Sequence, residues 1–382
     1  MQEISVTCSH AGKLQQCWQT MEMQGIYIVA GKHGGNAEGA IRAVAHGSLV
    51  SRATESGVEL LFEGVLTGGR EEGTEDAEIA LREWRRRGLQ GLRDLDGFYS
   101  VAVVESDRVT LVCDAMATRP QWVYQGNGVN ATAPTPVWFA EQALPMSFDR
   151  LGFYQSLRLM HGVGKRTLVN EVSRNRPLTA YVFHRDGRLD ELEQQPVHQR
   201  LDETRTVEQA TDELRDLMAD VMHGLLTHPK LGERTVHLPL TAGMDSRHIL
   251  AQLRRMDRAP ASIRHVFVHS PEADPVVAMT KGLGHPLHML GLGELDYDSL
   301  HPQWVRTTAG LIHHHQIYLM GVVPTASEVD EDNGGFIGFD GYLADKLVGF
   351  ACRHVLLDGR FYAKATLPLL FGDSRALERS TL

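Results

Sequence analysis

The sequence predicts two domains of different classes: an α+β antiparallel sandwich, followed by an α/β doubly wound parallel sheet. In the first half, short apolar runs follow one another with turn residues between them, which is typical of antiparallel strands. In the second half, strands alternate with helices, which favours parallel pairing. A small-residue loop joins one of those strands to a helix. We expect domains at 1–190 and 191–382.

The strands of the first domain are apolar runs bounded by Gly, Asp and Asn. One helix is expected to start at Glu75, with Ile79, Ala80 and Trp84 on its apolar face. Residues 125–150 are rich in Gly, Asn and Pro, which predicts loops. The predicted strands are 23–31, 59–66, 92–104 and 109–114.

The second domain is predicted to open with a long amphipathic helix. Thr206 and Gln209 form a plausible capping box, and apolar residues recur at helical spacing from Val207 to Leu225. Strand and helix signals then alternate, as a doubly wound sheet requires. The predicted order is strand 235–240, helix 245–253, strand 263–268 and helix 274–283.

The loop after the first of these strands has the composition of a phosphate site. Ala242 and Gly243 are small enough for the main chain to approach phosphate oxygens, and Thr241 and Ser246 supply hydroxyl donors. The N–H groups and the dipole of the following helix favour an anion. The Asp245 carboxylate is of the type that holds Mg²⁺ on a bound phosphate.

This stretch resembles the pyrophosphate loop, Ser-Gly-Gly-x-Asp-Ser, of ATP pyrophosphatases such as the asparagine synthetase family. Thr241 and Ala242 depart from that pattern but keep a hydroxyl and a small side chain. A later stretch, from Gly338 to Leu347, is similar to the family's L-x-G-x-G-x-D-E-L, and Asp345 follows Asp245 by 100 residues. The resemblance implies an adenine-nucleotide hydrolase-like fold that uses ATP and Mg²⁺. It implies nucleotide-binding residues Leu240, Thr241, Ala242, Gly243, Met244, Asp245, Ser246, Val268 and Gly338, and metal ligands Asp245 and Asp345, with Asp340 as the weaker alternative.

The first domain resembles a class II glutamine amidotransferase domain, which implies an Ntn-hydrolase-like sandwich. The family begins Met-Cys-Gly-Ile, with the Cys as nucleophile, whereas this chain has Met23-Gln24-Gly25-Ile26. An amide is not a nucleophile, so we expect no glutamine hydrolysis. Cys8 is the alternative nucleophile, but its surroundings do not match the family.

Family members without that Cys include β-lactam synthetases and lasso-peptide cyclases. The resemblance therefore implies an AMP-forming carbon–nitrogen ligase of natural-product or peptide-modification (antibiotic) biosynthesis. Such an enzyme adenylates a small-molecule or peptide carboxylate, which then reacts with an amine already on the substrate. An inactive subunit that binds a peptide or partner enzyme, and an ammonia-dependent amide synthetase, are the alternatives.

The C-terminal part is shorter than in full-length relatives, so no catalytic residue is assigned. Lys346 and Lys364 are the later lysines, and neither matches the family's lysine that stabilises the adenylate. A partner chain could supply the missing part, and a homodimer is left open.

The composition of the chain argues against several functional classes of protein. A net charge of -10 argues against a general nucleic-acid binder, and no apolar run reaches the ~18 residues of a membrane span. The N-terminus lacks a signal-peptide pattern, and four scattered cysteines fit a reducing compartment, so we expect a cytoplasmic protein. The run 313–315 of three histidines is not expected to bind metal, because neighbouring side chains diverge. Acidic residues between 328 and 332 are expected to form a solvated loop or a lid.

Overall fold

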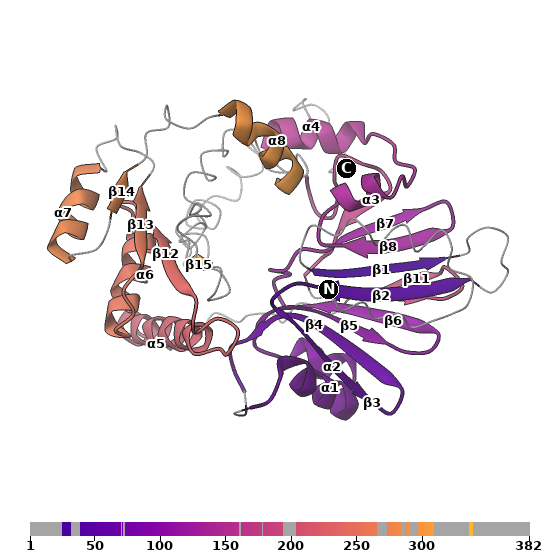
Figure 1. Ribbon diagram of the computed structural model, residues 1–382, viewed down its shortest axis with the longest axis horizontal. Coiled ribbons are helices and arrows are strands. Elements are labelled where there is room, and N and C mark those ends of the chain that lie inside the picture. The colour runs from indigo at the N-terminus through magenta and orange to yellow at the C-terminus, as the bar shows by residue number, and fades with distance from the viewer. Residues whose placement is uncertain are drawn as a thin grey trace. The chain divides into compact units, whose positions relative to one another are not determined.

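Figure 1 shows the computed structural model of the chain, which divides into two compact units. The first comprises Met1–Gly152 and Val163–Gly232, and the second Phe153–Gly162 and Glu233–Leu382. This division differs from the boundary expected near residue 190, because the long helix after residue 206 and its following turn join the first unit. The structure describes residues 25–31, 39–69, 71, 73–159, 162–177, 179–193, 204–265, 273–283, 287–289, 297–308 and 336–338.

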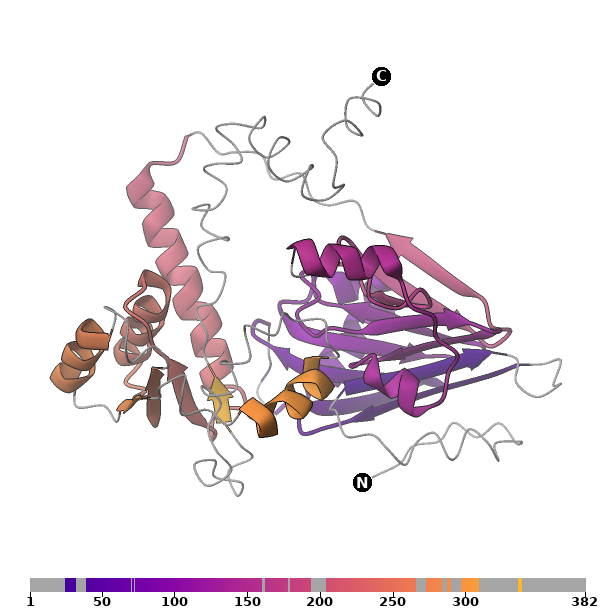
Figure 2. The ribbon, with the colours of Figure 1, turned by 90° about the horizontal axis from the view of Figure 1, so that it is seen from above.

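The first unit contains two antiparallel sheets, as predicted (Figure 2). The five-stranded sheet has the order β2-β1-β8-β7-β9, and the six-stranded sheet has the order β11-β10-β6-β5-β4-β3. The strands of the first are β1 (Gly25–Gly31), β2 (Ala40–His46), β7 (Trp122–Gly126), β8 (Val129–Ala133) and β9 (Val172–Arg174). Those of the second are β3 (Val50–Glu55), β4 (Val58–Leu66), β5 (Gly97–Val104), β6 (Arg108–Cys113), β10 (Thr179–His184) and β11 (Leu189–Glu193).

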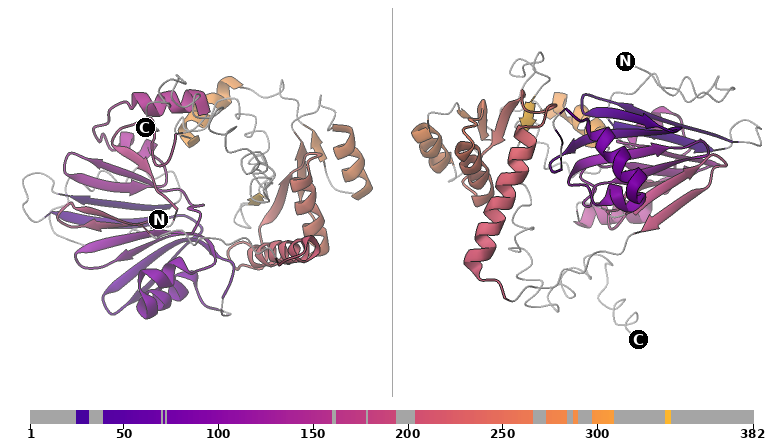
Figure 3. Two further views of the ribbon diagram at one scale, coloured as in Figure 1. Left: turned by 180° about the vertical axis from the view of Figure 1, so that it is seen from behind. Right: turned by 90° about the horizontal axis from the view of Figure 1, so that it is seen from below.

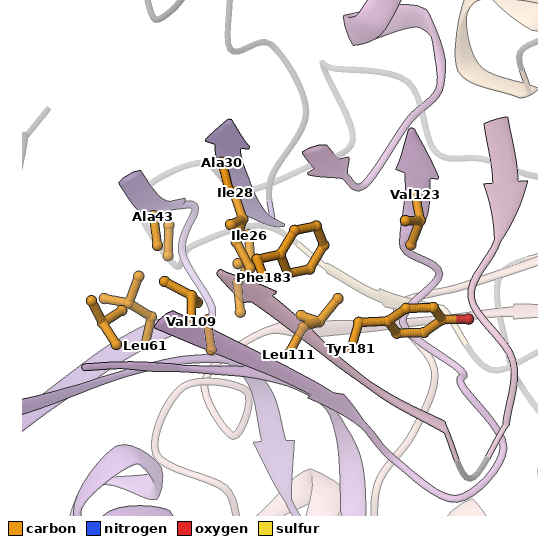
Figure 4. Packing of buried hydrophobic residues seen from close by; sticks show 13 residues of the cluster. Ile26, Ile28, Ala30, Ala43, Leu61, Val109, Leu111, Val123, Tyr181 and Phe183 are labelled. Carbon is orange, nitrogen blue, oxygen red and sulfur yellow. The ribbon is translucent and has the colours of Figure 1, made fainter. Parts of the chain in front are cut away.

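An apolar core fills the space between these sheets (Figure 4). Ile26 and Ile28 of β1 meet Leu111 and Phe183 of the facing sheet, and all four are fully buried. Burial of each such side chain stabilises the fold by about 1.5–3 kcal/mol. The alternation of apolar residues along these strands is what selects the inward face.

Helices cover the outer face of each sheet. Helices α1 (Asp76–Arg87) and α2 (Leu89–Arg93) pack on the six-stranded sheet, where Phe62 and Tyr99 stack with ring centroids 5.5 Å apart. Helix α3 (Val137–Glu141) brings Trp138 against Tyr27 of the five-stranded sheet, at 5.2 Å. The unit is therefore layered as helix, sheet, sheet and helix. Helix α4 (Arg150–Leu159) begins at the end of its first segment and belongs mostly to the second unit.

The prediction of loops over 125–150 was wrong for part of that range. Strand β8 and helix α3 lie within it, and β7 extends to Gly126. Asn127 and Gly128 have φ values of 50° and 75°, and they join β7 to β8 as a two-residue hairpin. Asn-Gly is the preferred pair for that turn, so the residues that suggested a loop instead form a tight turn between strands.

Helix α5 (Val207–Leu226) begins with the predicted capping box, in which Thr206 accepts from the Gln209 N–H and the Gln209 side chain accepts from the Thr206 N–H. Only its last turns are buried, through Met222 and Leu226. Gly224 allows this close packing, since a Cβ there would lie 2.6 Å from the carbonyl oxygen of Thr67.

A buried pair fixes the turn that follows α5. The Nε2 of His228 lies 2.9 Å from an Asp76 carboxylate oxygen, and the two side chains are 1% and 0% exposed. The Lys230 N–H donates to Nδ1 of the same imidazole at 3.1 Å, which makes Nε2 the protonated nitrogen facing Asp76. The turn is thereby attached to the first residue of α1.

We expect His228→Ala to lower the free energy of unfolding by about 2–3 kcal/mol, because a buried carboxylate loses a hydrogen-bond donor. Urea denaturation followed by circular dichroism measures this. His223→Ala, in the exposed last turn of α5, is the matched control and should cost under about 0.5 kcal/mol. Equal small effects of both substitutions would contradict an anchoring role for His228.

The second unit contains a four-stranded parallel sheet of order β14-β13-β12-β15, as the alternating pattern predicts. Its strands are β12 (Thr235–Pro239), β13 (Ser262–His265), β14 (Leu287–Met289) and β15 (Phe336–Gly338). Its helices are α6 (Met244–Arg255), α7 (Ala273–Leu283) and α8 (Tyr297–Thr308) (Figure 3). In the described part of the chain, no helix is long and apolar enough to cross a membrane.

Candidate functional site

The strand that leads into the candidate site is buried on both faces. Val236, His237 and Leu238 of β12 are at most 4% exposed, and Leu240 beyond its end is fully buried. Leu250 and Leu253 of α6 are also buried, which gives that helix one apolar face. Strand, loop and helix therefore form the unit that the sequence predicts, with the loop 240–243 held between two rigid elements.

The loop lies where the order of the sheet reverses. From β12, the chain adds β13 and then β14 on one side, whereas β15 pairs with β12 on the other. In open parallel sheets, ligands bind at the carboxyl ends of the strands at such a reversal. Gly338 pairs with His237, two residues before the end of β12, so the sheet brings Gly338 to the same edge as the loop.

Two hydroxyl groups organise the loop. The Ser246 hydroxyl donates to the Thr241 carbonyl at 3.2 Å and accepts from the Thr241 N–H at 3.1 Å. The Thr241 hydroxyl accepts from the Gly243 N–H at 3.1 Å, and it lies 3.2 Å from the Ser246 hydroxyl. A Cβ on Gly243 would lie 3.0 Å from Thr241 Oγ1, so the loop is closely packed at this position and favours a small residue.

The N-terminus of α6 is open to an acceptor. Gly243 is the N-cap residue, and among the residues that the structure describes no side chain caps the first turn. The first N–H groups of a helix need partners from outside it, and its dipole favours negative charge there. Met244, in this first turn, is 77% exposed. Its side chain has no hydrogen-bond donor, so an anion would bind its backbone N–H.

Asp245 fits the predicted role of a Mg²⁺ ligand. Its half-buried carboxylate lies in the first turn of α6 and, among the described residues, makes no hydrogen bond or ion pair. Within that same part of the chain, no three His, Cys, Asp or Glu residues are grouped to hold a metal alone. Asp245 would therefore hold Mg²⁺ together with ligand oxygens and further residues.

The site is thus partly assembled by the described residues. The loop residues 240–246 and Gly338 meet at one sheet edge, whereas Val268, Asp340 and Asp345 lie outside the described residues. The same holds for Cys8, Gln24, the histidines 313–315, the acidic residues 328–332, Lys346 and Lys364. The second metal ligand therefore stays a prediction.

One contact of the loop was not predicted from the sequence. His265, at the carboxyl end of β13, is 1% exposed, and its Nδ1 lies 2.8 Å from the Leu240 carbonyl oxygen. A carbonyl only accepts, so Nδ1 carries the proton. Strand β13 reads Ser-Ile-Arg-His, so polarity alone did not distinguish His265 in the sequence.

The first unit has a buried polar layer, made by side chains of β4, β5 and β6 and of the segment after β9. Ser100 and Cys113 are cross-strand neighbours, and the Asn175 amide donates to the Cys113 sulfur at 3.0 Å. Burial raises the pKa of Cys113 to about 12, so the thiol stays protonated at neutral pH. A protonated, buried thiol is a poor nucleophile.

Glu63 carries the ionisable carboxyl of this layer. Burial raises its pKa above the usual value, and the Arg119 guanidinium, 2.8 Å away, opposes that shift to a smaller extent. A raised pKa in the folded state favours folding below about pH 4, where unfolded Glu is protonated. This contribution is lost as the pH rises through the folded-state pKa.

We therefore expect the unfolding free energy of the wild type, relative to that of Glu63→Gln, to fall between pH 4 and pH 7. Glutamine cannot ionise, so the variant lacks this pH dependence. Urea denaturation of both proteins at several pH values measures the difference. If the wild type instead becomes more stable than Glu63→Gln as the pH rises, the ion pair with Arg119 outweighs the cost of burying the charged carboxylate.

Comparison with known proteins gives weak likenesses. No protein-family profile matches the chain, and no curated protein matches it. One similar structure is glutamine phosphoribosylpyrophosphate amidotransferase from B. subtilis complexed with ADP and GMP. Its sequence is 13% identical, the match covers 74% of this chain and 87% of that chain, and the TM-score is 0.31. Another is described as the allosteric regulatory enzyme of purine biosynthesis. Its sequence is 11% identical, the match covers 70% of this chain and 74% of that chain, and the TM-score is 0.29. Scores at this level do not establish a shared fold.

Proposed function

We propose that this chain forms an amide bond by adenylating a carboxylate with ATP and Mg²⁺. The observation that carries the proposal is the loop 240–243, placed at the reversal of a parallel sheet and followed by an uncapped helix with Asp245 in its first turn. Such a site binds a phosphate chain through backbone N–H groups.

The proposed reaction has two steps. A carboxylate oxygen of the substrate bonds to the α-phosphorus, the bond from that phosphorus to the bridging oxygen breaks, and pyrophosphate leaves. An amine then attacks the acyl carbon, AMP leaves with the bonding electrons, and the amine loses a proton. A bound Mg²⁺ would neutralise charge on the leaving pyrophosphate.

This chain's own residues would act mainly by positioning and charge stabilisation. The N–H groups of the first turn of α6 would hold the leaving group, and the Ser246 hydroxyl keeps the loop in shape. The amine is proposed to come from the substrate, since the sequence has Gln24 where a glutaminase needs Cys.

Pyrophosphate release is the test. The purified chain, ATP and Mg²⁺ are incubated with a library of amino-acid and peptide carboxylates, and pyrophosphate and AMP are measured. Release that requires both Mg²⁺ and a carboxylate supports the proposal, and adding ammonia, glutamine or a second amine identifies the donor. If isothermal titration shows no binding of ATP or pyrophosphate, the enzyme proposal fails and the inactive-subunit alternative is favoured.

A further inference from the structure

Helix α5 carries a row of apolar side chains that the fold leaves largely exposed. Its members are spaced alternately three and four residues apart, and we call them the α5 stripe: Val207, Ala210, Leu214, Leu217 and Val221. Val207, Leu214 and Leu217 are 78%, 42% and 60% exposed. This spacing is the heptad repeat by which one helix packs along another. Since α5 is a capped and uninterrupted helix, it presents the stripe as one continuous seam (Figure 2).

The first unit holds α5 by a different side of the helix. Met222 and Leu226 are its buried residues, and their four-residue spacing places them on one side. That side lies roughly a third of a turn around the helix from the α5 stripe. The stripe is therefore not needed to anchor α5. A row of exposed apolar side chains on a protein that folds without them indicates an interaction surface.

The charges around the α5 stripe are mainly negative. The helix contains five acidic residues and one arginine. Glu213 and Asp220 each precede a residue of the stripe, so they lie along the same edge of it. Asp220 is exposed and, within the described part of the chain, makes no hydrogen bond or ion pair. Glu213 lies 2.5 Å from Arg205, but both side chains are more than half exposed, so this pair is weak and exchangeable.

These charges distinguish between three kinds of occupant. A second copy packed antiparallel would bring the acidic edge against itself, and a parallel copy would place Met218 and Leu225 there, which offer no cation. A membrane surface attracts helices that carry Lys and Arg on their polar face, whereas the polar face of α5 is acidic. A helix with Lys or Arg beside its own apolar seam matches both the stripe and its edge.

We propose that the α5 stripe is the docking site for an amphipathic helix of a partner protein, with apolar residues at heptad spacing and basic residues beside them. Leu214 and Leu217, in the middle of the stripe, make the main apolar contacts, and Asp220 selects the positive charge. The stripe shares no residue with the loop 240–246, so loss of the proposed enzymatic activity would leave this docking site unaffected.

The probe is a synthetic peptide of three heptads with leucine along its seam and lysine at the flanking positions, compared with the same peptide carrying glutamate there. Isothermal titration measures the binding of each peptide to the full-length protein. We expect the lysine peptide to bind at least about 10-fold more tightly. Leu217→Gln should weaken its binding by about 10-fold to 100-fold, because burial of one leucine is lost. Leu192→Gln, at a leucine of β11 that is 43% exposed, is the matched control and should have no effect.

Reversal of one charge tests the role of the acidic edge. Asp220→Lys should reverse the preference, so that the glutamate peptide binds more tightly than the lysine peptide. Asp216→Lys makes the same change on the side of α5 that faces away from the stripe, and should keep the wild-type preference. Circular dichroism confirms that each variant is folded, and analytical ultracentrifugation gives its oligomeric state.

Four outcomes would overturn the inference. If the wild type binds neither peptide, the α5 stripe is not a docking site for a helix. Equal affinity for the two peptides would mean that charge does not select the partner. If the wild type is a dimer and Leu217→Gln is a monomer, a second copy occupies the stripe. If the wild type binds phosphatidylglycerol vesicles and Leu217→Gln does not, the stripe meets a lipid surface.

Discussion

Asp245→Asn is expected to reduce ATP-dependent pyrophosphate release by about 100-fold to 1,000-fold. Charge stabilisation at a reacting phosphate supplies effects of this size. The substitution keeps the shape of the side chain and removes the charge that would hold Mg²⁺. Since the carboxylate makes no hydrogen bond or ion pair with another described residue, its loss should leave the fold intact. The measurement is a steady-state pyrophosphate assay over a range of Mg²⁺ concentrations.

Asp257→Asn is the matched control, because it makes the same chemical change just beyond the other end of α6. Asp257 is exposed and has a φ of 53°, a left-handed conformation that Asn also tolerates. This control should keep full activity. Normal turnover by Asp245→Asn at limiting Mg²⁺ would remove Asp245 from the metal site and leave the enzyme proposal without its charged residue.

Gly64→Ala is expected to lower the free energy of unfolding by about 3 kcal/mol or more. Gly64 has a φ of 130°, and a Cβ there would lie 2.0 Å from the carbonyl oxygen of Phe98 and 2.8 Å from the Cα of Tyr99. Both are backbone atoms of the paired strand β5, so they cannot move without opening the sheet. Strain and overpacking each cost about 1–3 kcal/mol. Urea denaturation and thermal melting measure the loss.

Gly57→Ala separates the two causes. Gly57 lies between β3 and β4 with a φ of 75°, and a Cβ there would have no atom within 4 Å. Only conformational strain applies, so we expect a loss of about 1 kcal/mol. If the two alanine variants unfold at the same urea concentration, the close approach of β4 to β5 at Gly64 has been overestimated.

Much of the fold could be predicted from periodicity. Strands β1, β4, β5 and β6 and helices α1, α5 and α7 lie where apolar spacing and caps indicate. The hairpin at Asn127-Gly128 was missed because the same residue types serve in loops and in tight turns, and only pairing with a second strand distinguishes them. The unit boundary also depends on a distant contact, since His228 and Asp76 are 152 residues apart.

For the candidate site, the local strand-loop-helix geometry was predictable from the sequence, whereas the contacts between distant strands were not. Small residues and hydroxyls between a strand and a helix indicate the loop, and the structure gives it that geometry. The neighbouring position of Gly338 required the strand order, and the contact of His265 with Leu240 required the register of β13.

The pairing of Thr235 with Phe336 has a consequence during synthesis of the protein. Every strand of the antiparallel sandwich has been translated before β12 begins, whereas β12 must wait about a hundred residues for β15. Until then β12 is an edge strand, and an unpaired apolar edge recruits strands from other molecules. Shortened chains that stop before residue 336 should therefore aggregate through β12.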